Sequence, residues 1–393
     1  MTAPRTVRAP ITTPATAQVF TTVLTHGPIS RQDVARLTGL SSAAVTKAAR
    51  PFIDAGYLRE LDPVLRATGA GRPTVPLGVC ADREFFLGVK VTADELIGVV
   101  TDLRARTRHS LHRPLGGRSV GEVVRALSWL ADELLATRPD DRARAHCLGV
   151  AVSGDVDRAT GSVRYSPFLG WRDVPLGELL GEATGLTVTV ENDVKSLAVA
   201  EYLFGHGVGS DDLALVTVGA GIGCALIVGG ALVAGARGVA GEIGHVPVRP
   251  DGPPCHCGGV GCVEAIASTQ AIVDAARLAT GDRALTLPDA VRLARAGDDR
   301  VRPLFERAGH AIGQGLAAVA NLVGPERIVV SGEGVAAYDL FEEAIRTTFA
   351  RQAFGAADCP LILSPLPFEE WARGAAAVAI QDLVTHRTAA PTR

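Results

Sequence analysis

Apolar side chains recur at helical spacing in three segments of the first 54 residues. The spacing predicts a helix over residues 15–27, a short helix over 31–37 and a third helix that runs to about residue 54. Ser41 or Ser42 would cap the third helix, because a serine oxygen accepts a hydrogen bond from the free amides of a helix start. A short helix, a tight turn and a further helix are typical of a helix-turn-helix.

Two extended segments follow the third predicted helix and enclose a glycine-rich turn. Residues 57–59 and 75–77 have the pattern of strands, and Gly-Arg-Pro lies in the turn between them. This arrangement predicts a wing that lays an arginine along a minor groove. A helical module that docks proteins is the alternative, but the wing favours DNA. The predicted DNA-binding residues are Ser42, Thr46, Lys47, Arg50, Gly71, Arg72 and Pro73.

Strand and helix patterns alternate through the rest of the chain. Helices are predicted at 119–138 and at 303–322, where three glycines permit close approach of neighbours. Such alternation predicts a doubly wound α/β architecture, present twice. The predicted strands lie at residues 86–91, 96–102, 106–112, 146–152, 213–218, 222–228 and 328–330.

The composition adds one clue, an uneven distribution of charge. The 393 residues are 47% hydrophobic and 21% charged, which excludes wholesale disorder. The formal net charge is −3, yet residues 1–80 hold nine Lys and Arg against four Asp and Glu, whereas the remainder holds 30 against 38. A basic N-terminal part on an acidic body supports the DNA-binding interpretation.

One uncharged segment, residues 213–236, is long enough to span a bilayer. Six glycines divide it into short pieces rich in β-branched residues, so buried strands joined by turns are the better interpretation. Residues 1–14 lack the apolar core of a signal peptide. We therefore expect a cytoplasmic protein with no membrane contact.

Three cysteines and a histidine form the strongest chemical signal in the sequence. Three thiolates and one imidazole match a closed tetrahedral zinc site, and the glycines between the cysteines let the backbone fold around a small cation. A redox cysteine pair, the alternative, does not account for the third cysteine and the histidine. Because four protein ligands leave no position for water, the predicted Zn²⁺ is structural. The predicted ligands are His245, Cys255, Cys257 and Cys262.

The residues around this cluster carry a resemblance to a known family. Gly241-Glu242-Ile243-Gly244-His245, followed by the cysteine motif through Glu264, resembles the signature of the ROK family of repressors, open reading frames and sugar kinases. Residues 153–157, 166–171 and 191–193 resemble the family's sugar-domain segments in order, and residues 219–223 resemble its second phosphate loop.

The resemblance implies an actin-like, ribonuclease-H-like pair of α/β lobes, preceded by the winged helix-turn-helix of the family's repressor branch. The expected bounds are a disordered arm at 1–14, the winged helix-turn-helix DNA-binding domain at 15–80, a ROK sugar-binding domain at 81–385 with lobes at about 81–200 and 201–372 and a last helix that returns to the first lobe, and a disordered tail at 386–393.

The resemblance also implies a sugar site. Carboxylates, an amide and a fixed imidazole are groups that bind polyols. For Asn192 and Asp193 the alternative is a cap on a helix over residues 194–206, since both residue types are favoured there. The implied sugar-binding residues are Asn192, Asp193, Glu242, His245 and Glu264.

Departures from the family pattern argue against kinase activity. The catalytic base position is kept as Asp193, but the first phosphate loop, Asp-x-Gly-Gly-Thr in family kinases, is replaced by Lys90-Val-Thr-Ala-Asp94. Glu333 adds negative charge where a nucleotide would lie. Phe168 stands at a position that is commonly asparagine in the family, which affects the identity of the sugar. We therefore predict no enzymatic activity.

The sequence thus predicts a sugar-responsive DNA-binding transcriptional regulator, in the first instance a repressor of carbohydrate uptake and catabolism genes. The expected partners are a double-stranded DNA operator, a sugar or sugar phosphate effector, and further copies of the chain in a homodimer or homotetramer. A ROK sugar kinase with an appended DNA-binding domain and a sugar-independent repressor controlled by a protein partner are the alternatives.

Overall fold

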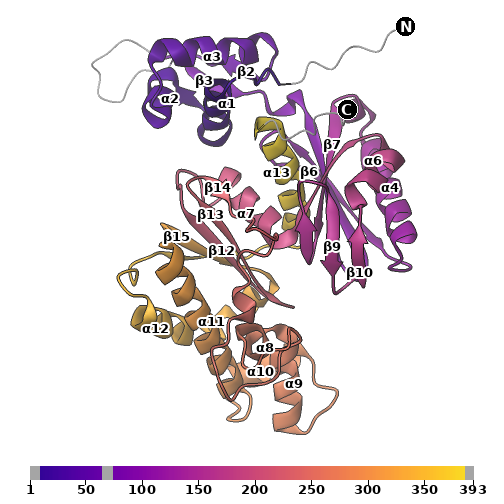
Figure 1. The fold of residues 1–393 in the computed structure, drawn as a ribbon, viewed down its shortest axis with the longest axis vertical. Coiled ribbons are helices and arrows are strands. Elements are labelled where there is room, and N and C mark those ends of the chain that lie inside the picture. The colour runs from indigo at the N-terminus through magenta and orange to yellow at the C-terminus, as the bar shows by residue number, and fades with distance from the viewer. Residues whose placement is uncertain (1–8, 64–73, 386–393) are drawn as a thin grey trace. The chain divides into compact units, whose positions relative to one another are not determined.

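The computed structural model describes residues 9–63 and 74–385 (Figure 1). The chain forms two compact units, the first made of Met1–Val208 and Trp371–Arg393 and the second of Gly209–Glu370. We refer to them as unit 1 and unit 2. The first eight residues of the predicted arm, the predicted wing contacts Gly71, Arg72 and Pro73, and the predicted tail lie outside the described residues.

The N-terminal part of unit 1 contains the three predicted helices. The side-chain oxygens of Ser30 and Ser41 cap α2 and α3, and Ser41 is one of the two serines predicted to cap the third helix. Phe20 stacks on Phe52 with ring centroids 4.5 Å apart, and Tyr57 packs edge-on against Phe20, which forms the core. The elements are α1 (Pro14–His26), β1 (Ile29–Ser30), α2 (Arg31–Thr38), α3 (Ser42–Asp54), β2 (Leu58–Glu60) and β3 (Pro76–Val79), with strand order β1-β3-β2.

A five-stranded sheet with the order β11-β7-β4-β5-β6 follows in unit 1. Strands β4, β7 and β11 are parallel, whereas β5 and β6 extend the sheet as antiparallel hairpins. The strands are β4 (Phe85–Val91), β5 (Glu95–Asp102), β6 (Thr107–Pro114), β7 (Ala145–Val152) and β11 (Thr187–Asn192). A small antiparallel sheet that the sequence pattern did not reveal consists of β8 (Asp155–Asp157), β9 (Ser162–Ser166) and β10 (Trp171–Val174).

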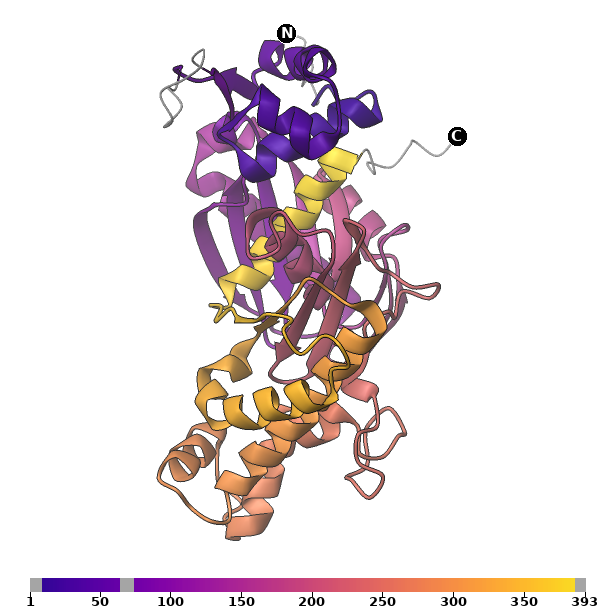
Figure 2. The ribbon, with the colours of Figure 1, turned by 90° about the vertical axis from the view of Figure 1, so that its left-hand side faces the viewer.

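Helices cover both faces of the unit 1 sheet. Helices α4 (Val120–Thr137) and α6 (Leu176–Thr184) pack on one face, and α13 (Glu369–Thr385) lies across the other, as Figure 2 shows in yellow. Glycine is required under α13, because a Cβ at Gly88 or Gly149 would lie 2.0 or 1.9 Å from a carbonyl oxygen of that helix. The last helix therefore packs directly on the backbone of β4 and β7.

Unit 2 is a second α/β layer structure. Its sheet has the order β14-β13-β12-β15-β16, in which β12, β15 and β16 are parallel. Gly309 and Gly313 let α11 approach α12 closely, which confirms the expected role of glycines in this helix. The elements are β12 (Leu213–Val218), β13 (Ile222–Val228), β14 (Ala231–Leu232), η2 (Ile243–His245), α8 (Val263–Ala267), α9 (Thr269–Thr280), α10 (Leu287–Arg295), α11 (Arg302–Val323), β15 (Arg327–Ser331), η3 (Glu333–Leu340), α12 (Glu342–Gln352) and β16 (Leu361–Leu363).

The uncharged segment at 213–236 forms β12, β13 and β14, as expected from its glycines. Within residues 9–63 and 74–385, none of the helices has both the length and the apolar character needed to cross a membrane.

Candidate functional site

Three adjacent parallel strands of unit 1 bring their polar ends together. Strands β4, β7 and β11 end in register, with Val91 opposite Val152 and Val152 opposite Asn192. Lys90 lies one residue before the end of β4, Ser153 follows β7, and Asp193 follows β11 as the first residue of α7 (Asp193–Phe204). Functional groups gather at the carboxyl ends of parallel strands because the following loops all start there.

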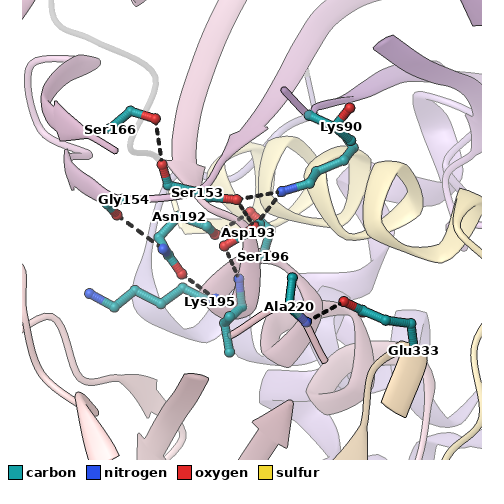
Figure 3. A network of polar contacts seen from close by, with 12 residues as sticks. Lys90, Ser153, Gly154, Ser166, Asn192, Asp193, Lys195, Ser196, Ala220 and Glu333 are labelled. Carbon is teal, nitrogen blue, oxygen red and sulfur yellow. Dashed lines mark hydrogen bonds and ion pairs between the residues drawn. The ribbon is translucent and has the colours of Figure 1, made fainter. Parts of the chain in front are cut away.

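The ammonium of Lys90 binds the carboxylate of Asp193 (Figure 3). Lys90 Nζ donates to Ser153 Oγ at 2.9 Å and to Asp193 Oδ2, and Ser153 Oγ donates to the same carboxylate oxygen at 2.5 Å. The backbone amide of Val194 donates to Oδ1 at 2.9 Å. The Lys90 ammonium also lies 5.5 Å from the ring centroid of Trp371 on α13.

This pair is buried, and burial determines its electrostatics. Only 6% of Lys90 and 8% of Asp193 is exposed. Burial alone would raise the pKa of Asp193, but the Lys90 ammonium and the Ser153 hydroxyl outweigh it and hold that pKa below its ordinary value. Asp193 is therefore ionised, with both oxygens already accepting hydrogen bonds.

Asn192 has structural contacts of its own. Its side-chain oxygen accepts from the amide of Lys195 at 3.1 Å and so caps α7, and its amide group donates to the carbonyl of Gly154 at 3.0 Å. The cap considered for this position is confirmed. Contact of Asn192 and Asp193 with a sugar stays a prediction.

Arg118 links the segment after β4 to the loop between β9 and β10. Its guanidinium donates to the Ala93 carbonyl at 2.8 Å, to the Asp94 carboxylate at 2.9 Å and to the Phe168 carbonyl at 3.3 Å. The Phe168 side chain is 48% exposed. Arg118 thus connects the segment after β4 to the loop that carries Phe168.

The predicted metal ligands of unit 2 converge. One donor atom from each of His245, Cys255, Cys257 and Cys262 lies within 4.8 Å of all the others. His245 Nδ1 is 3.6 Å from Cys255 Sγ, and Cys257 Sγ is 3.8 Å from Cys262 Sγ. A donor set of this composition suits a metal ion that prefers sulfur and nitrogen.

A glycine is essential to the fold of the loop 255–262, which carries the three cysteines. Gly261 has φ +66°, and a Cβ there would lie 1.6 Å from the Arg249 carbonyl oxygen. His256, between Cys255 and Cys257, has a side chain that is 67% exposed, with Nδ1 3.3 Å from a Glu264 oxygen.

The other two unit 2 residues predicted at the sugar site, Glu242 and Glu264, lie close to His245. Its Nε2 is 3.9 Å from a Glu242 oxygen, and donor atoms of His245, His256 and Glu264 lie within 4.8 Å of one another. The Glu264 carboxylate also accepts from the Ile222 amide at 2.9 Å. A metal on Nδ1 would leave Nε2 of the same ring for another partner, with the orientation of the ring fixed.

Helix α3 presents the predicted DNA contacts on one exposed face. Ser42, Thr46, Lys47 and Arg50 are all exposed. Arg50 pairs with Asp54 one turn away at 2.9 Å, a surface contact that is easily exchanged. These residues line a shallow pocket together with Ala43, Pro51 and Asp54.

Comparison with known proteins agrees with this arrangement. The sequence profile of the ROK family matches residues 86–382. This chain belongs to the ROK family. The N-acetylglucosamine repressor of Escherichia coli O6:H1 is 30% identical over 89% of this chain and 88% of its own length.

Two solved ROK structures are similar to this one. A ROK family transcriptional regulator, a homolog of the E. coli MLC protein, superposes with a TM-score of 0.80 at 26% identity over 95% of this chain and 98% of its own. A ROK family glucokinase from Streptomyces griseus, in complex with glucose and AMPPNP, has a TM-score of 0.65 at 28% identity over 76% of this chain and 99% of its own. The chain is a ROK-family transcriptional repressor, homologous to the N-acetylglucosamine repressor and to the regulator that is a homolog of the E. coli MLC protein.

Two contacts of the ROK domain were missed by sequence reasoning. The sequence shows a lysine in place of an acid at position 90, but it does not reveal that the Lys90 ammonium binds Asp193. The sequence shows the negative charge of Glu333, but it does not reveal that the Glu333 carboxylate accepts a hydrogen bond from the Ala220 amide at 2.7 Å. The signal that could have revealed them is position, because the two members of each pair lie close to the carboxyl ends of parallel strands that belong to one sheet.

The Lys90–Asp193 pair makes a prediction about stability. Lys90→Met should lower the free energy of unfolding by about 3–5 kcal/mol at pH 7, because Asp193 would stay buried without its counter-charge. Adding Asp193→Asn should recover most of this loss. Urea unfolding of the wild type, both single variants and the double variant measures the coupling, and Lys47→Met serves as a control at an exposed lysine.

The same experiment has a pH dependence of defined sign. Because the pKa of Asp193 is lowered in the folded state, the stabilisation is complete above the ordinary carboxyl pKa and is lost as the pH falls through the folded value. Wild type and Lys90→Met should therefore converge in acid. Strictly additive single effects would show that the two residues do not form the pair.

Proposed function

We propose that this ROK protein is a sugar-responsive repressor that binds a palindromic DNA operator through α3 and does not phosphorylate its effector. The observation that carries the proposal is the Lys90–Asp193 ion pair, because it engages the carboxylate that would have to act as the catalytic base. The predicted DNA-contacting face of α3 remains exposed. The expected assembly is a homodimer or homotetramer, because a palindrome is matched by protein symmetry.

Asp193 is poorly suited to serve as a catalytic base. A base must accept a proton from a sugar hydroxyl, and its efficiency falls as its pKa falls below the working pH. Asp193 has a lowered pKa, and its Oδ2 accepts from both Lys90 and Ser153. The site therefore favours binding over phosphoryl transfer.

The effector we propose is a sugar or sugar phosphate. Glu242, His245 and Glu264 in unit 2 supply two acceptors and an imidazole at short mutual distances. In unit 1, Asn192 and Asp193 stand at the carboxyl ends of the parallel strands, where small ligands commonly bind α/β folds.

Strand β4 offers a route from this edge to the DNA-binding helices within unit 1. Lys90 lies near one end of β4, and Glu84, which precedes the other end, accepts a hydrogen bond from the buried Tyr57 hydroxyl at 2.6 Å. Arg83 donates to the Ala55 carbonyl at 3.0 Å, next to α3. We propose that a shift of β4 on effector binding moves α3 through these contacts.

The metal we propose is structural Zn²⁺. Three thiolates and one imidazole complete a tetrahedron, so zinc would supply a fixed loop and no open coordination position. Cys262 directly precedes α8, which carries Glu264. The metal would therefore hold Glu264 and His245 in place for the effector.

Loss of one zinc ligand should loosen this loop. Cys257→Ser should purify with clearly less than one zinc per chain and with faster amide exchange at residues 255–264, because the serine hydroxyl is a weak zinc ligand. Zinc is measured by elemental analysis of the purified protein. Cys359→Ser, remote from the cluster in sequence, is the control, and full zinc content in Cys257→Ser would show that the ligand set is wrong.

Helix α3 should bind DNA chiefly through charge and through contacts to base edges. Lys47→Ala should weaken binding at all sequences and lower the slope of log K against log salt by about one. Fluorescence anisotropy over a series of salt concentrations measures the DNA affinity. The DNA duplexes are those that the wild-type protein selects from a random pool. Arg292→Ala, an exposed arginine of α10, is the control, and equal losses from both variants would contradict a role for α3.

The proposed route through β4 predicts a variant in which sugar binding no longer changes operator affinity. A panel of glucose, N-acetylglucosamine and their 6-phosphates first identifies a sugar that raises the unfolding temperature. Tyr57→Phe should keep that stabilisation and its operator affinity within about twofold, yet lose most of the effect of the sugar on operator affinity. Glu242→Ala should lose the stabilisation itself. A full sugar response in Tyr57→Phe would exclude the route through Glu84.

A further inference from the structure

The loop that follows β12 in unit 2 directs two backbone amides at carboxylates of the protein itself. The Ala220 amide donates to Glu333 Oε1 at 2.7 Å, and the Ile222 amide donates to Glu264 Oε2 at 2.9 Å. The loop contains Gly219 and Gly221, and it begins at the carboxyl end of a parallel strand. Glycine-rich loops at this position in α/β sheets form concave sets of amides that bind phosphate groups.

The backbone around Glu333 is built to bring its carboxylate onto this loop. Strand β15 pairs with β12 and ends at Ser331, so residues 332–334 start beside the loop. Gly332 has φ +96°, and a Cβ at Gly332 or Gly334 would lie 2.6 or 2.8 Å from the Val218 carbonyl oxygen. The glycines on both sides of Glu333 thus allow the segment to pack on the end of β12.

The carboxylate also fills space directly above the loop. A Cβ at Gly219 would lie 2.2 Å from Glu333 Cδ, so the carboxylate rests against the Gly219 backbone. A phosphate that approached the Ala220 amide would meet the same oxygen atoms and the same negative charge.

We propose that Glu333 is a built-in anion that closes a latent triphosphate-binding site on the loop 219–222. Its carboxylate takes the hydrogen bond that a phosphate oxygen would otherwise accept from Ala220. The contact lies at the surface, so it adds little to the stability of the fold. Its effect is on selectivity, because a nucleoside triphosphate would have to break the hydrogen bond and also approach a like charge.

Removal of the carboxylate should open the site. In the full-length protein, Glu333→Ala should bind MgATP and inorganic tripolyphosphate with a dissociation constant at least about tenfold lower than wild type, as measured by isothermal titration calorimetry, since one obstructing charge and one competing acceptor are lost. Adenosine without phosphates should gain nothing. If Glu333→Ala is poorly folded, Glu333→Gln should show the same direction with a smaller gain, because it removes the charge and keeps the side chain.

The matched control is Glu326→Ala. Glu326 also accepts from backbone amides of unit 2, those of Asp211 and Asp212, but at an ordinary turn. It should gain no affinity for either phosphate probe. The proposal is overturned if wild type binds MgATP as tightly as Glu333→Ala, if neither Glu333 variant gains affinity, or if adenosine gains as much as the triphosphates.

Discussion

The buried ion pair between Lys90 and Asp193 is the interaction on which the chemical character of unit 1 depends. Two opposite charges taken out of water are stable only as a pair with satisfied hydrogen bonds, and Ser153 and the Val194 amide complete that set. The same contacts outweigh the effect of burial and hold the pKa of Asp193 below its ordinary value. These contacts are the basis of the proposed role in binding rather than in phosphoryl transfer.

Unit 2 contains a similar contact in which the charge of the side chain is negative instead of positive. In unit 1 a cation satisfies the carboxylate at the ends of the parallel strands, and in unit 2 the Glu333 carboxylate satisfies the amide at the end of β12. In both units a charged side chain of the protein satisfies a polar group near the carboxyl end of a parallel strand. The cluster of His245, Cys255, Cys257 and Cys262 is of a different kind, because its four donor atoms lie close together and could bind a metal ion.

The sequence allowed much of this to be predicted, for physical reasons that differ between elements. The helices of the N-terminal part follow from apolar spacing and from the capping serines Ser30 and Ser41, which are local signals. The metal cluster follows from the identity and spacing of its ligands. The strands β8, β9 and β10 are short and half-exposed, so they leave no clear pattern. The Lys90–Asp193 contact joins residues 103 positions apart in the sequence. It depends on the order of the strands in the sheet, which local sequence patterns do not reveal.

The position of α13 has a consequence for the order in which the protein is made. Its first residues follow unit 2 in the chain, yet it packs on Gly88 and Gly149 of the unit 1 sheet. On the ribosome, the DNA-binding helices emerge first, whereas the glycine-lined face of the sheet stays uncovered until the whole of unit 2 has been synthesised. Trp371 arrives with that last helix, so the surroundings of Lys90 are completed only then. The N-terminal helices are therefore synthesised well before the surroundings of Lys90 are complete.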